Sequence, residues 1–297
     1  MAGGRDGFRG GALDAADALT IRPLRPADRE RVLEIVADVW DGHDYLPQVL
    51  DDWLADPAGN FQAGELDGVV VAVHRWRPIQ RSIAYYEGMR VAKDHRRQGI
   101  GRTMLRAAIE EVRGLEGYEV LRLATGNPHA RALFESEGFR HRLTVTHWEA
   151  DRIEGGEPAR MPPVADAARL HRMLSADPAL AAYAGLDPLP DGPLEVDVGY
   201  LEELLRGGRL REGAGGRALA LAGPYFGGRR LIASLVAGSG AALQDLLLAL
   251  RYEADADGRE GVGILAPRDH PAEKDFQAVG YDQPDRGWEF SILDLTL

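Results

Sequence analysis

Two glycines and three arginines stand close together in RRQGIGR, residues 96–102. A short apolar strand is predicted to end just before them at Val91, and an apolar pattern with helical spacing begins at Ile100. Glycines allow a ligand to approach the first turn of a helix, where unpaired backbone N–H groups and the helix dipole attract anions. The segment therefore predicts an anion-binding turn, with a solvated charged turn as the alternative.

Single residues exclude two familiar phosphate cradles. A Walker loop needs Lys and then Ser or Thr after its last glycine, whereas Arg102 and Thr103 follow Gly101 here. A dinucleotide fingerprint needs a third glycine at the position that Met104 occupies. What is left is the pattern Arg-x-x-Gly-x-Gly between a strand and a helix.

The elements that must position this turn follow from hydrophobic periodicity and turn residues. One face of the helix that starts at the turn is apolar, with Ile100, Met104, Leu105, Ala108, Ile109 and Val112. Strands are predicted at about 19–24, 61–66, 69–77, 82–91, 120–125 and 142–148, and further helices after Asp28 and over 128–137.

The stretch NPHARALFESEGF, residues 127–139, follows the strand at 120–125. With the glycine turn upstream of it, the sequence resembles the GCN5-related N-acetyltransferase (GNAT) superfamily over roughly residues 18–150. The resemblance implies an α/β (α+β) fold with a mixed, mostly antiparallel sheet flanked by helices. It also implies acetyl-CoA as co-substrate, with its pyrophosphate on the turn amides and its pantetheine arm near Asn127. The coenzyme-binding residues that the resemblance implies are Met89, Arg90, Val91, Arg96, Arg97, Gln98, Gly99, Ile100, Gly101, Arg102, Asn127 and Phe134.

Amine acetylation requires the acceptor as a free base, so a side chain or a water relay must remove a proton. In many members of the superfamily a glutamate on the strand before the turn is the base, which implies this role for Glu87. If no bulge intervenes, Glu87 shares a strand face with Met89 and Val91, where a backbone N–H near 89–91 would bind the oxyanion. The alternative is a surface glutamate with no catalytic role.

Phe134 departs from the superfamily, whose members commonly have a tyrosine there that protonates the leaving thiolate. Either water replaces that hydroxyl, or Tyr85 or Tyr86 does. We take Tyr86 as the candidate catalytic residue, with packing as the alternative for both tyrosines.

The acceptor side is implied by the segment between the first two helices, which carries Asp44 and Tyr45. Asp44 could hold an ammonium or imidazole group and Tyr45 could stack on it, whereas helix capping is the alternative for Asp44. DYLP at 44–47 and EGMRV at 87–91 are similar to the histidine N-acetyltransferase type of tandem acetyltransferase. That likeness implies a free amino acid as acceptor, with histidine as a candidate, and Arg90 as partner of its carboxylate. Strict alternation would place Arg90 on the face opposite Glu87.

The second half of the chain contains an internal repeat. Residues 266–281 align without gaps on 124–139, and 231–250 repeat the order of strand, glycine turn and helix. The second glycine turn lacks arginines, and Asp269 replaces Asn127. We therefore expect a flexible N-terminus at 1–17, a catalytic domain at 18–150, a linker at 151–163 and a degenerate GNAT-like domain at 164–297. The last is expected to have lost coenzyme binding and to close the acceptor site or form a subunit contact.

Composition limits the other possibilities. The 297 residues suit two domains, and 35 basic against 47 acidic residues give a net charge of −12, which disfavours nucleic-acid binding. Cysteine is absent, and the eight histidines lack metal-ligand spacing, so no metal is expected. No apolar run fits a signal peptide or a membrane span, which predicts a cytoplasmic protein, either monomer or homodimer.

Three function classes stay open at this point. The first is an N-acetyltransferase that acts on a small-molecule amine. The second is an acetyltransferase of proteins or peptides, which would need an open groove. The third is a non-catalytic sensor of coenzyme A, which Phe134 suggests.

Overall fold

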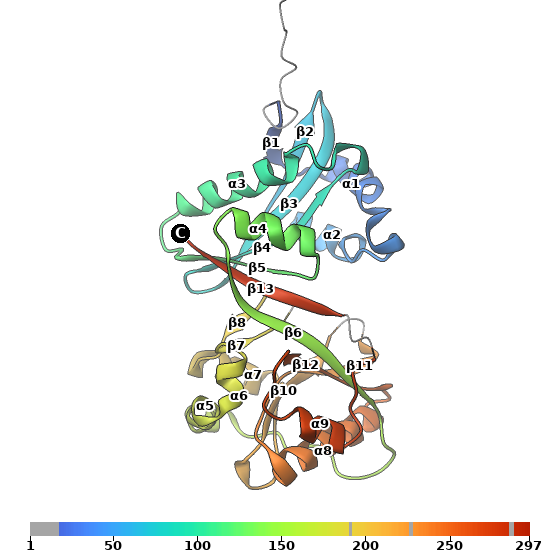
Figure 1. The fold of residues 1–297 in the computed structure, drawn as a ribbon, viewed down its shortest axis with the longest axis vertical. Coiled ribbons are helices and arrows are strands. Elements are labelled where there is room, and N and C mark those ends of the chain that lie inside the picture. Colours follow the sequence, from blue (N-terminus) through green and yellow to red (C-terminus); the bar gives the residue numbers. More distant parts are fainter. Residues whose placement is uncertain (1–17, 190–191, 226–227, 285–287) are drawn as a thin grey trace, which may run out of the picture. The chain divides into compact units, whose positions relative to one another are not determined.

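The computed structural model describes residues 18–189, 192–225, 228–284 and 288–297 (Figure 1). The predicted flexible N-terminus at 1–17 lies outside the described residues. The chain divides into two compact units, of which the first runs to Leu121 and includes Leu297, and the second runs from Arg122 to Thr296.

Antiparallel strands in the order β1-β2-β3-β4 form the sheet of the first unit. They are β1 (Thr20–Pro23), β2 (Asn60–Leu66), β3 (Val69–Gln80) and β4 (Ile83–Val91). The helices are α1 (Arg29–Val36), α2 (Leu46–Ala55) and α3 (Ile100–Arg113), with short 3-10 turns η1 (Pro26–Asp28), η2 (Val39–Gly42) and η3 (Lys93–His95). The sheet has apolar side chains on both faces, and helices cover each of them.

Helix α3 packs on one face of this sheet (Figure 1). Its buried residues are Ile100, Met104, Leu105, Ala108, Ile109 and Val112, the stripe that periodicity predicts. Helices α1 and α2 cover the other face, where Val32, Leu46 and Leu50 pack against Phe61 and Val73. The predicted sequence of strand, glycine turn and helix is thus confirmed.

The second unit has a mixed sheet in the order β5-β13-β6-β12-β11-β10-β9. Its strands are β5 (Val120–Thr125), which straddles the unit boundary, β6 (Arg140–Asp151), β9 (Leu210–Glu212), β10 (Leu219–Pro224), β11 (Arg230–Ala237), β12 (Gly261–Pro267) and β13 (Glu289–Thr296). A separate pair comprises β7 (Leu186–Asp187) and β8 (Leu194–Glu195). Antiparallel pairs predominate, and β11 pairs in parallel with β12. The predicted fold class, a mixed and mostly antiparallel sheet flanked by helices, is confirmed.

Helices cover both faces of the second sheet. They are α4 (Pro128–Ser136), α5 (Ala167–Ala176), α6 (Pro178–Ala182), α7 (Val198–Arg206), α8 (Gly240–Ala256) and α9 (Glu273–Ala278), with 3-10 turns η4 (Val164–Asp166) and η5 (Ala214–Gly216). Leucines of α5 and α7 pack in one core cluster with Leu221 and Leu235. Leucines of α8 and Phe276 of α9 pack in a second cluster with Val236 and Ile264.

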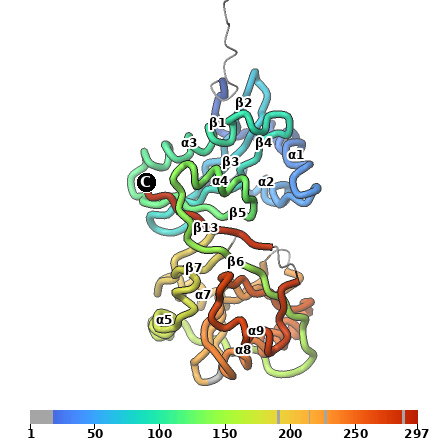
Figure 2. The backbone as a smooth tube through the Cα atoms, in the orientation of Figure 1, coloured from blue at the N-terminus to red at the C-terminus, as the bar shows by residue number. Residues whose placement is uncertain are grey.

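Strand β6 lies between β12 and β13 and is antiparallel to both. Figure 2 shows the backbone of β6 next to that of β13. The hydrogen bonds of β6 therefore join it to the C-terminal half of the chain, and the boundary between the compact units falls at 121/122. The linker is predicted at 151–163, but Asp151 is the last residue of β6. Residues 152–163 are described throughout and contain no helix or strand apart from one bridge between Arg160 and Glu212. The domain boundary at 150 stays a prediction.

None of the helices in the described part of the chain has the length and apolar character needed to cross a membrane.

Candidate active site

The glycine turn of the first unit has a backbone that its sequence explains. Arg97 has φ of 64° and Gly99 has φ of 82°, both in the left-handed region. Glycine adopts this conformation without strain, whereas an arginine pays a conformational cost. The turn connects β4 to α3, which begins at Ile100.

The N–H groups of residues 98–101 are the chemical feature of this turn. Within the described residues, none of these four groups has a hydrogen-bond acceptor. The first bonds of the helix come later, from the N–H groups of Arg102 and Thr103 to the carbonyl of Gly99, at 2.9 and 3.0 Å. Four unpaired donors at the positive end of a helix of 14 residues form a site for an anion.

The three arginines of the turn differ in their surroundings. The guanidinium of Arg96 donates to both carboxylate oxygens of Asp38, at 2.9 and 2.7 Å, and to the carbonyl of Val91, at 2.9 Å. Arg96 therefore holds the turn against the rest of the unit. Arg97 and Arg102 are exposed on either side of the unpaired N–H groups. Of the three predicted phosphate partners, these two suit that role.

Gly101 lies over the end of β4. A Cβ atom at this position would lie 3.6 Å from Sδ of Met89 and 3.7 Å from a methyl of Val91, which are ordinary contact distances. Met89 and Val91 thus face α3, and the fold itself would accept a methyl group at 101.

A bulge at Gly88 changes which side chains share a face of β4. Arg75 pairs with Glu87 and Val73 pairs with Arg90, so His74 alone faces Gly88 and Met89. Gly88 has φ of 67°, and a Cβ there would lie 2.6 Å from the ring of Trp53. The alternation shifts by one residue at this point.

As a result, the prediction that Glu87 shares a face with Met89 and Val91 is wrong. Glu87 bonds to Arg75, whose guanidinium lies 4.7 Å from the ring centre of Trp53 in α2. Arg90 also points to the side of β4 that α2 covers, where it pairs with Asp44 in the loop before α2. The bulge thus puts Glu87 and Arg90 on one face of the strand.

Two arginines surround the Glu87 carboxylate. It accepts hydrogen bonds from Arg75 at 3.0 Å and from Arg77 at 2.8 Å, and its side chain is 7% exposed. Arg75 also pairs with Asp56. Glu87 is therefore a buried, charge-compensated carboxylate and not a surface glutamate. Both arginines escaped the sequence prediction, although charged residues at alternate positions in an otherwise apolar strand are a signal.

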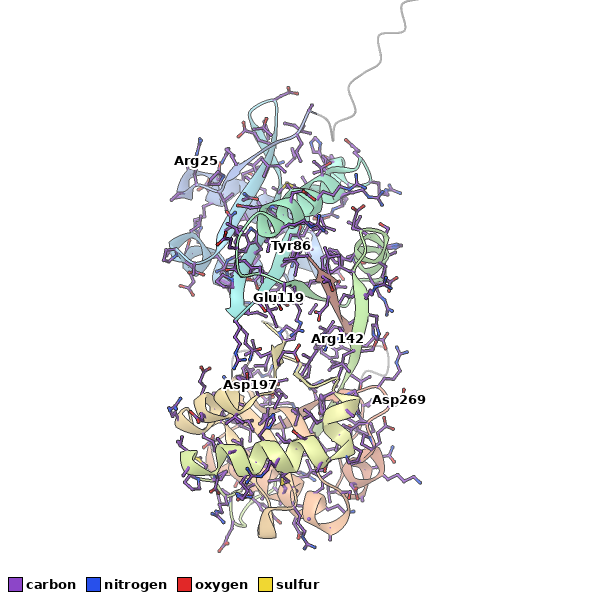
Figure 3. The ribbon with its side chains drawn as sticks, turned by 90° about the vertical axis from the view of Figure 1, so that its left-hand side faces the viewer. Arg25, Tyr86, Glu119, Arg142, Asp197 and Asp269 are labelled. Atoms are coloured by element: carbon purple, nitrogen blue, oxygen red, sulfur yellow. The ribbon has the colours of Figure 1, made fainter. Side chains whose placement is uncertain are left out.

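Tyr86 is buried in the interior of the first unit (Figure 3). As the neighbour of Glu87 along β4, it points to the opposite face of the sheet. The side-chain N–H of Gln62 donates to Glu111 at 3.3 Å, so its carbonyl oxygen faces Nε2 of His74 at 2.8 Å. That arrangement places the histidine proton on Nε2, and Nδ1 accepts from the Tyr86 hydroxyl at 3.1 Å. The two predicted catalytic side chains, Tyr86 and Glu87, do not converge on one face.

Burial controls the ionisation of this buried pair. It lowers the pKa of His74 to about 3 and raises the pKa of Tyr86 above its usual range. Both side chains are thus neutral at physiological pH.

The predicted acceptor residues come together around Arg90. Its guanidinium donates to both oxygens of Asp44, at 2.6 and 3.0 Å, and lies 5.4 Å from the ring centre of Tyr45. Asp44 also accepts from the N–H of Leu46 at 3.0 Å, so it caps α2 as the alternative prediction states. Since both of its oxygens are engaged and its side chain is 1% exposed, Asp44 serves Arg90 and α2 rather than an acceptor ammonium.

Trp40 completes this cluster and was missed by sequence reasoning. Its ring centre is 4.9 Å from the Arg90 guanidinium, and its side chain is 57% exposed. Trp40 and Asp41 have φ of 49° and 55°, an uncommon conformation for non-glycine residues that is often found at functional sites. A tryptophan in a polar loop next to Gly42 was the available signal.

Asn127 and Phe134 belong to the second unit. The Asn127 side chain caps α4, where its oxygen accepts from the N–H groups of His129 and Ala130 at 2.9 and 3.3 Å. Phe134 is buried, with its ring centre 5.8 Å from that of Phe139. The structure thus assigns both residues a local role in α4, and their predicted coenzyme contacts stay predictions.

Across the described residues, no group of three or more His, Asp or Glu side chains is arranged to hold a metal ion.

Residues 29–139 match the acetyltransferase (GNAT) family. The likeness to this family is that of the matched segment and not of the whole chain. The segment contains β2 to β4, the glycine turn and α3, so the unpaired N–H groups lie inside the matched region. The protein is accordingly an acyltransferase.

Solved structures extend the likeness in fold to most of the chain. A GCN5-related N-acetyltransferase from Sphaerobacter thermophilus is 12% identical, with 94% of this chain and 96% of that chain covered and a TM-score of 0.61. A GCN5-related N-acetyltransferase from Kribbella flavida is 15% identical, with 94% and 71% covered and a TM-score of 0.53. Comparison with curated proteins gives no significant match.

Proposed function

We propose that the protein transfers the acetyl group of acetyl-CoA to the amine of a small molecule, a free amino acid with histidine as one candidate. The observation that carries the proposal is the row of unpaired N–H groups at 98–101 inside the segment that matches the GNAT family. These groups would hold the pyrophosphate of the coenzyme, and Arg97 and Arg102 would neutralise its charge.

In the proposed reaction the free amine attacks the thioester carbonyl and forms the C–N bond, with the carbonyl electron pair moving to oxygen. Collapse of this tetrahedral oxyanion then breaks the C–S bond and releases the thiolate. A backbone N–H near Met89 to Val91 stabilises the oxyanion. Because the bulge turns Glu87 away from the side of β4 that Met89 faces, we propose that Glu87 takes up the amine proton through an ordered water. The guanidinium groups of Arg75 and Arg77 hold the Glu87 carboxylate in place, at 3.0 and 2.8 Å.

The leaving thiolate must gain a proton. Phe134 has no hydroxyl, and the hydroxyl proton of Tyr86 is donated to His74. We therefore assign this proton to water, and Tyr86→Phe tests the assignment, since a loss of kcat in that variant would return the role to the tyrosine.

The cluster of Trp40, Tyr45 and Arg90 supports an acceptor site for a small molecule. Asp44 and the carbonyl of Met89 take three of the N–H groups of Arg90, so an acceptor carboxylate would bind the N–H groups that remain. The exposed ring of Trp40 offers a flat apolar surface. The chain would act as a tandem-type acetyltransferase in the cytoplasm, as a monomer or homodimer, with the C-terminal repeat as a degenerate GNAT-like domain.

The test is a mass-spectrometric screen of the purified protein with acetyl-CoA and a mixture of free amino acids, polyamines and aminoglycosides. Glu87→Gln is run in parallel, with Glu110→Gln, an exposed residue of α3, as the matched control. An acetylated amino acid that forms with the parent and Glu110→Gln but fades with Glu87→Gln supports the proposal. If acetyl-CoA binds but no acetylated product forms, peptide acceptors are tested next. Absence of acetylated peptides would then favour the non-catalytic sensor of coenzyme A.

A further inference from the structure

The second unit repeats the element order that forms the anion site of the first. Strand β11 is followed by Gly238 and Gly240 and then by α8, as β4 is followed by Gly99 and Gly101 and then by α3. Helix α8 has 17 residues, so its N-terminus carries a full dipole. The element order alone would allow a second anion site at the N-terminus of α8. Whether that N-terminus can accept an anion depends on the residues around it.

A carboxylate of the protein already occupies the N-terminus of α8. One oxygen of Asp275 accepts the N–H of Gly240 at 2.9 Å, and the other accepts the side-chain N–H of Gln244 at 2.7 Å. Asp275 lies in α9, 35 residues further along the chain from Gly240. The negative charge that a helix N-terminus attracts is thus supplied from within the unit.

Backbone also covers the glycine turn before α8. Gly238 has φ of 110°, and a Cβ atom there would lie 2.7 Å from the carbonyl oxygen of Arg217 and 2.9 Å from Cα of Ala218. The chain at 217–218 therefore crosses directly over the turn. At Gly101, by contrast, a Cβ would meet only side-chain atoms, at ordinary distances.

The position at the carboxyl ends of β11 and β12, where the two strands stop pairing, is filled as well. Their parallel pairing ends at Ala233 and Ile264, and ligands of parallel sheets bind at this carboxyl end of the strands. Beyond that point the hydroxyl of the fully buried Tyr183 accepts the N–H of Val236 at 3.2 Å and donates to the carbonyl of Leu265 at 2.8 Å. The tyrosine thus bridges the two strands where a ligand would enter.

A buried histidine closes the same region. The N–H of Ala272 donates to Nδ1 of His270 at 3.1 Å, so Nε2 carries the proton and donates to the carbonyl of Val236 at 3.2 Å. Asp269, at the position that corresponds to Asn127, is exposed in the second unit (Figure 3) and caps no helix. The repeat therefore keeps the elements, but a carboxylate, a tyrosine and a histidine of the same unit lie around its glycine turn.

We infer that the second repeat is closed by its own residues: Asp275 takes the place of a bound phosphate on α8, and Tyr183 fills the opening between the strands. The second unit then binds no coenzyme. This inference rests on the proposed function of the first turn, because that turn defines what a coenzyme site in the repeat would look like. The full chain should bind one coenzyme, at the turn before α3.

The test is isothermal titration of the full chain with coenzyme A, alongside the variant Arg97→Ala/Arg102→Ala. We expect one site per chain in the parent and weaker binding at that same site in the variant. Two sites per chain would overturn the inference. Absence of any site would refute the proposed function of the first turn while supporting a closed second unit.

A second measurement tests the role of Asp275 itself. Asp275→Asn removes the charge on α8 and should lower the thermal midpoint by about 2–4 °C, with the KM for acetyl-CoA unchanged. Asp245→Asn makes the same charge change at an exposed position of α8 and should leave the midpoint unaltered. Equal midpoints for the two variants would show that the Asp275 carboxylate does not serve as the internal anion.

Discussion

Replacing Arg97 and Arg102 together by alanine should weaken acetyl-CoA binding without slowing the chemical step. Both side chains are exposed and lie in the sequence beside the unpaired N–H groups of 98–101. The double variant leaves the backbone donors in place, so binding should weaken and not vanish.

The size of the effect follows from the exposure of the two side chains. An exposed ion pair contributes roughly 0.2–1 kcal/mol, so two contacts with the coenzyme phosphates amount to about 0.4–2 kcal/mol. At about 1.4 kcal/mol for each factor of ten, the KM for acetyl-CoA should rise between roughly twofold and thirtyfold. The gap between parent and variant should narrow in high salt, since screening acts on exposed charges.

Steady-state kinetics at saturating acceptor, at low and at high salt, measure this prediction. Arg113→Ala is the control, because Arg113 is the last residue of α3 and pairs with Glu110 at 2.7 Å, far from the turn. Arg113→Ala removes one positive charge, as each of the two turn substitutions does, and should leave the KM for acetyl-CoA unaltered. If the double variant has the parent's KM, the arginines do not contact phosphates and the reasoning fails.

Three further predictions concern catalysis and stability. In steady-state assays Glu87→Gln should lower kcat about a hundredfold or more and leave the KM for acetyl-CoA unchanged. The same kcat in this variant and in the parent would exclude Glu87 as the base. Asp44→Asn leaves Arg90 buried without a counter-ion and should lower the free energy of unfolding in urea by about 3–5 kcal/mol. Asp51→Asn removes a charge from an exposed ion pair and should lower it far less. Similar urea midpoints for the two variants would contradict this prediction. His74 has a pKa of about 3 when folded and about 6.5 when unfolded, so the unfolded state binds its proton first as the pH falls. Stability should therefore drop between pH 6.5 and 3, by up to about 1.4 kcal/mol per pH unit from this group, and His74→Gln should reduce the slope of urea midpoints over this range.

The glycine turn and helix α3 could be predicted from the sequence because their determinants are local. The buried residues of α3 are the apolar stripe that helical spacing indicates, and the left-handed conformation of Gly99 is one that glycine adopts freely. The family resemblance rests on this same stretch.

The bulge in β4 could not be predicted, because its cause lies elsewhere in the chain. Gly88 is packed against Trp53 of α2, and a side chain at 88 would collide with that ring. Nothing in the residues around 88 reports this contact, so regular alternation was the natural expectation. The orientation of Glu87 and Arg90 changes with it.

Strand pairing in the second unit shows the same limit. The segment at 142–148 reads as a strand, but its partners β12 and β13 lie more than a hundred residues further along the sequence. The choice of partner depends on which sheet edges are available after folding, and the residues of one strand alone do not specify it.

The central claim is that the first unit transfers an acetyl group from acetyl-CoA to an amine. Release of the coenzyme thiol measures this directly, and the protein adds no background because its sequence contains no cysteine. The account predicts thiol release that depends on added amino acids and falls in Glu87→Gln. Tight binding of acetyl-CoA with no thiol release in the presence of any amine would contradict it.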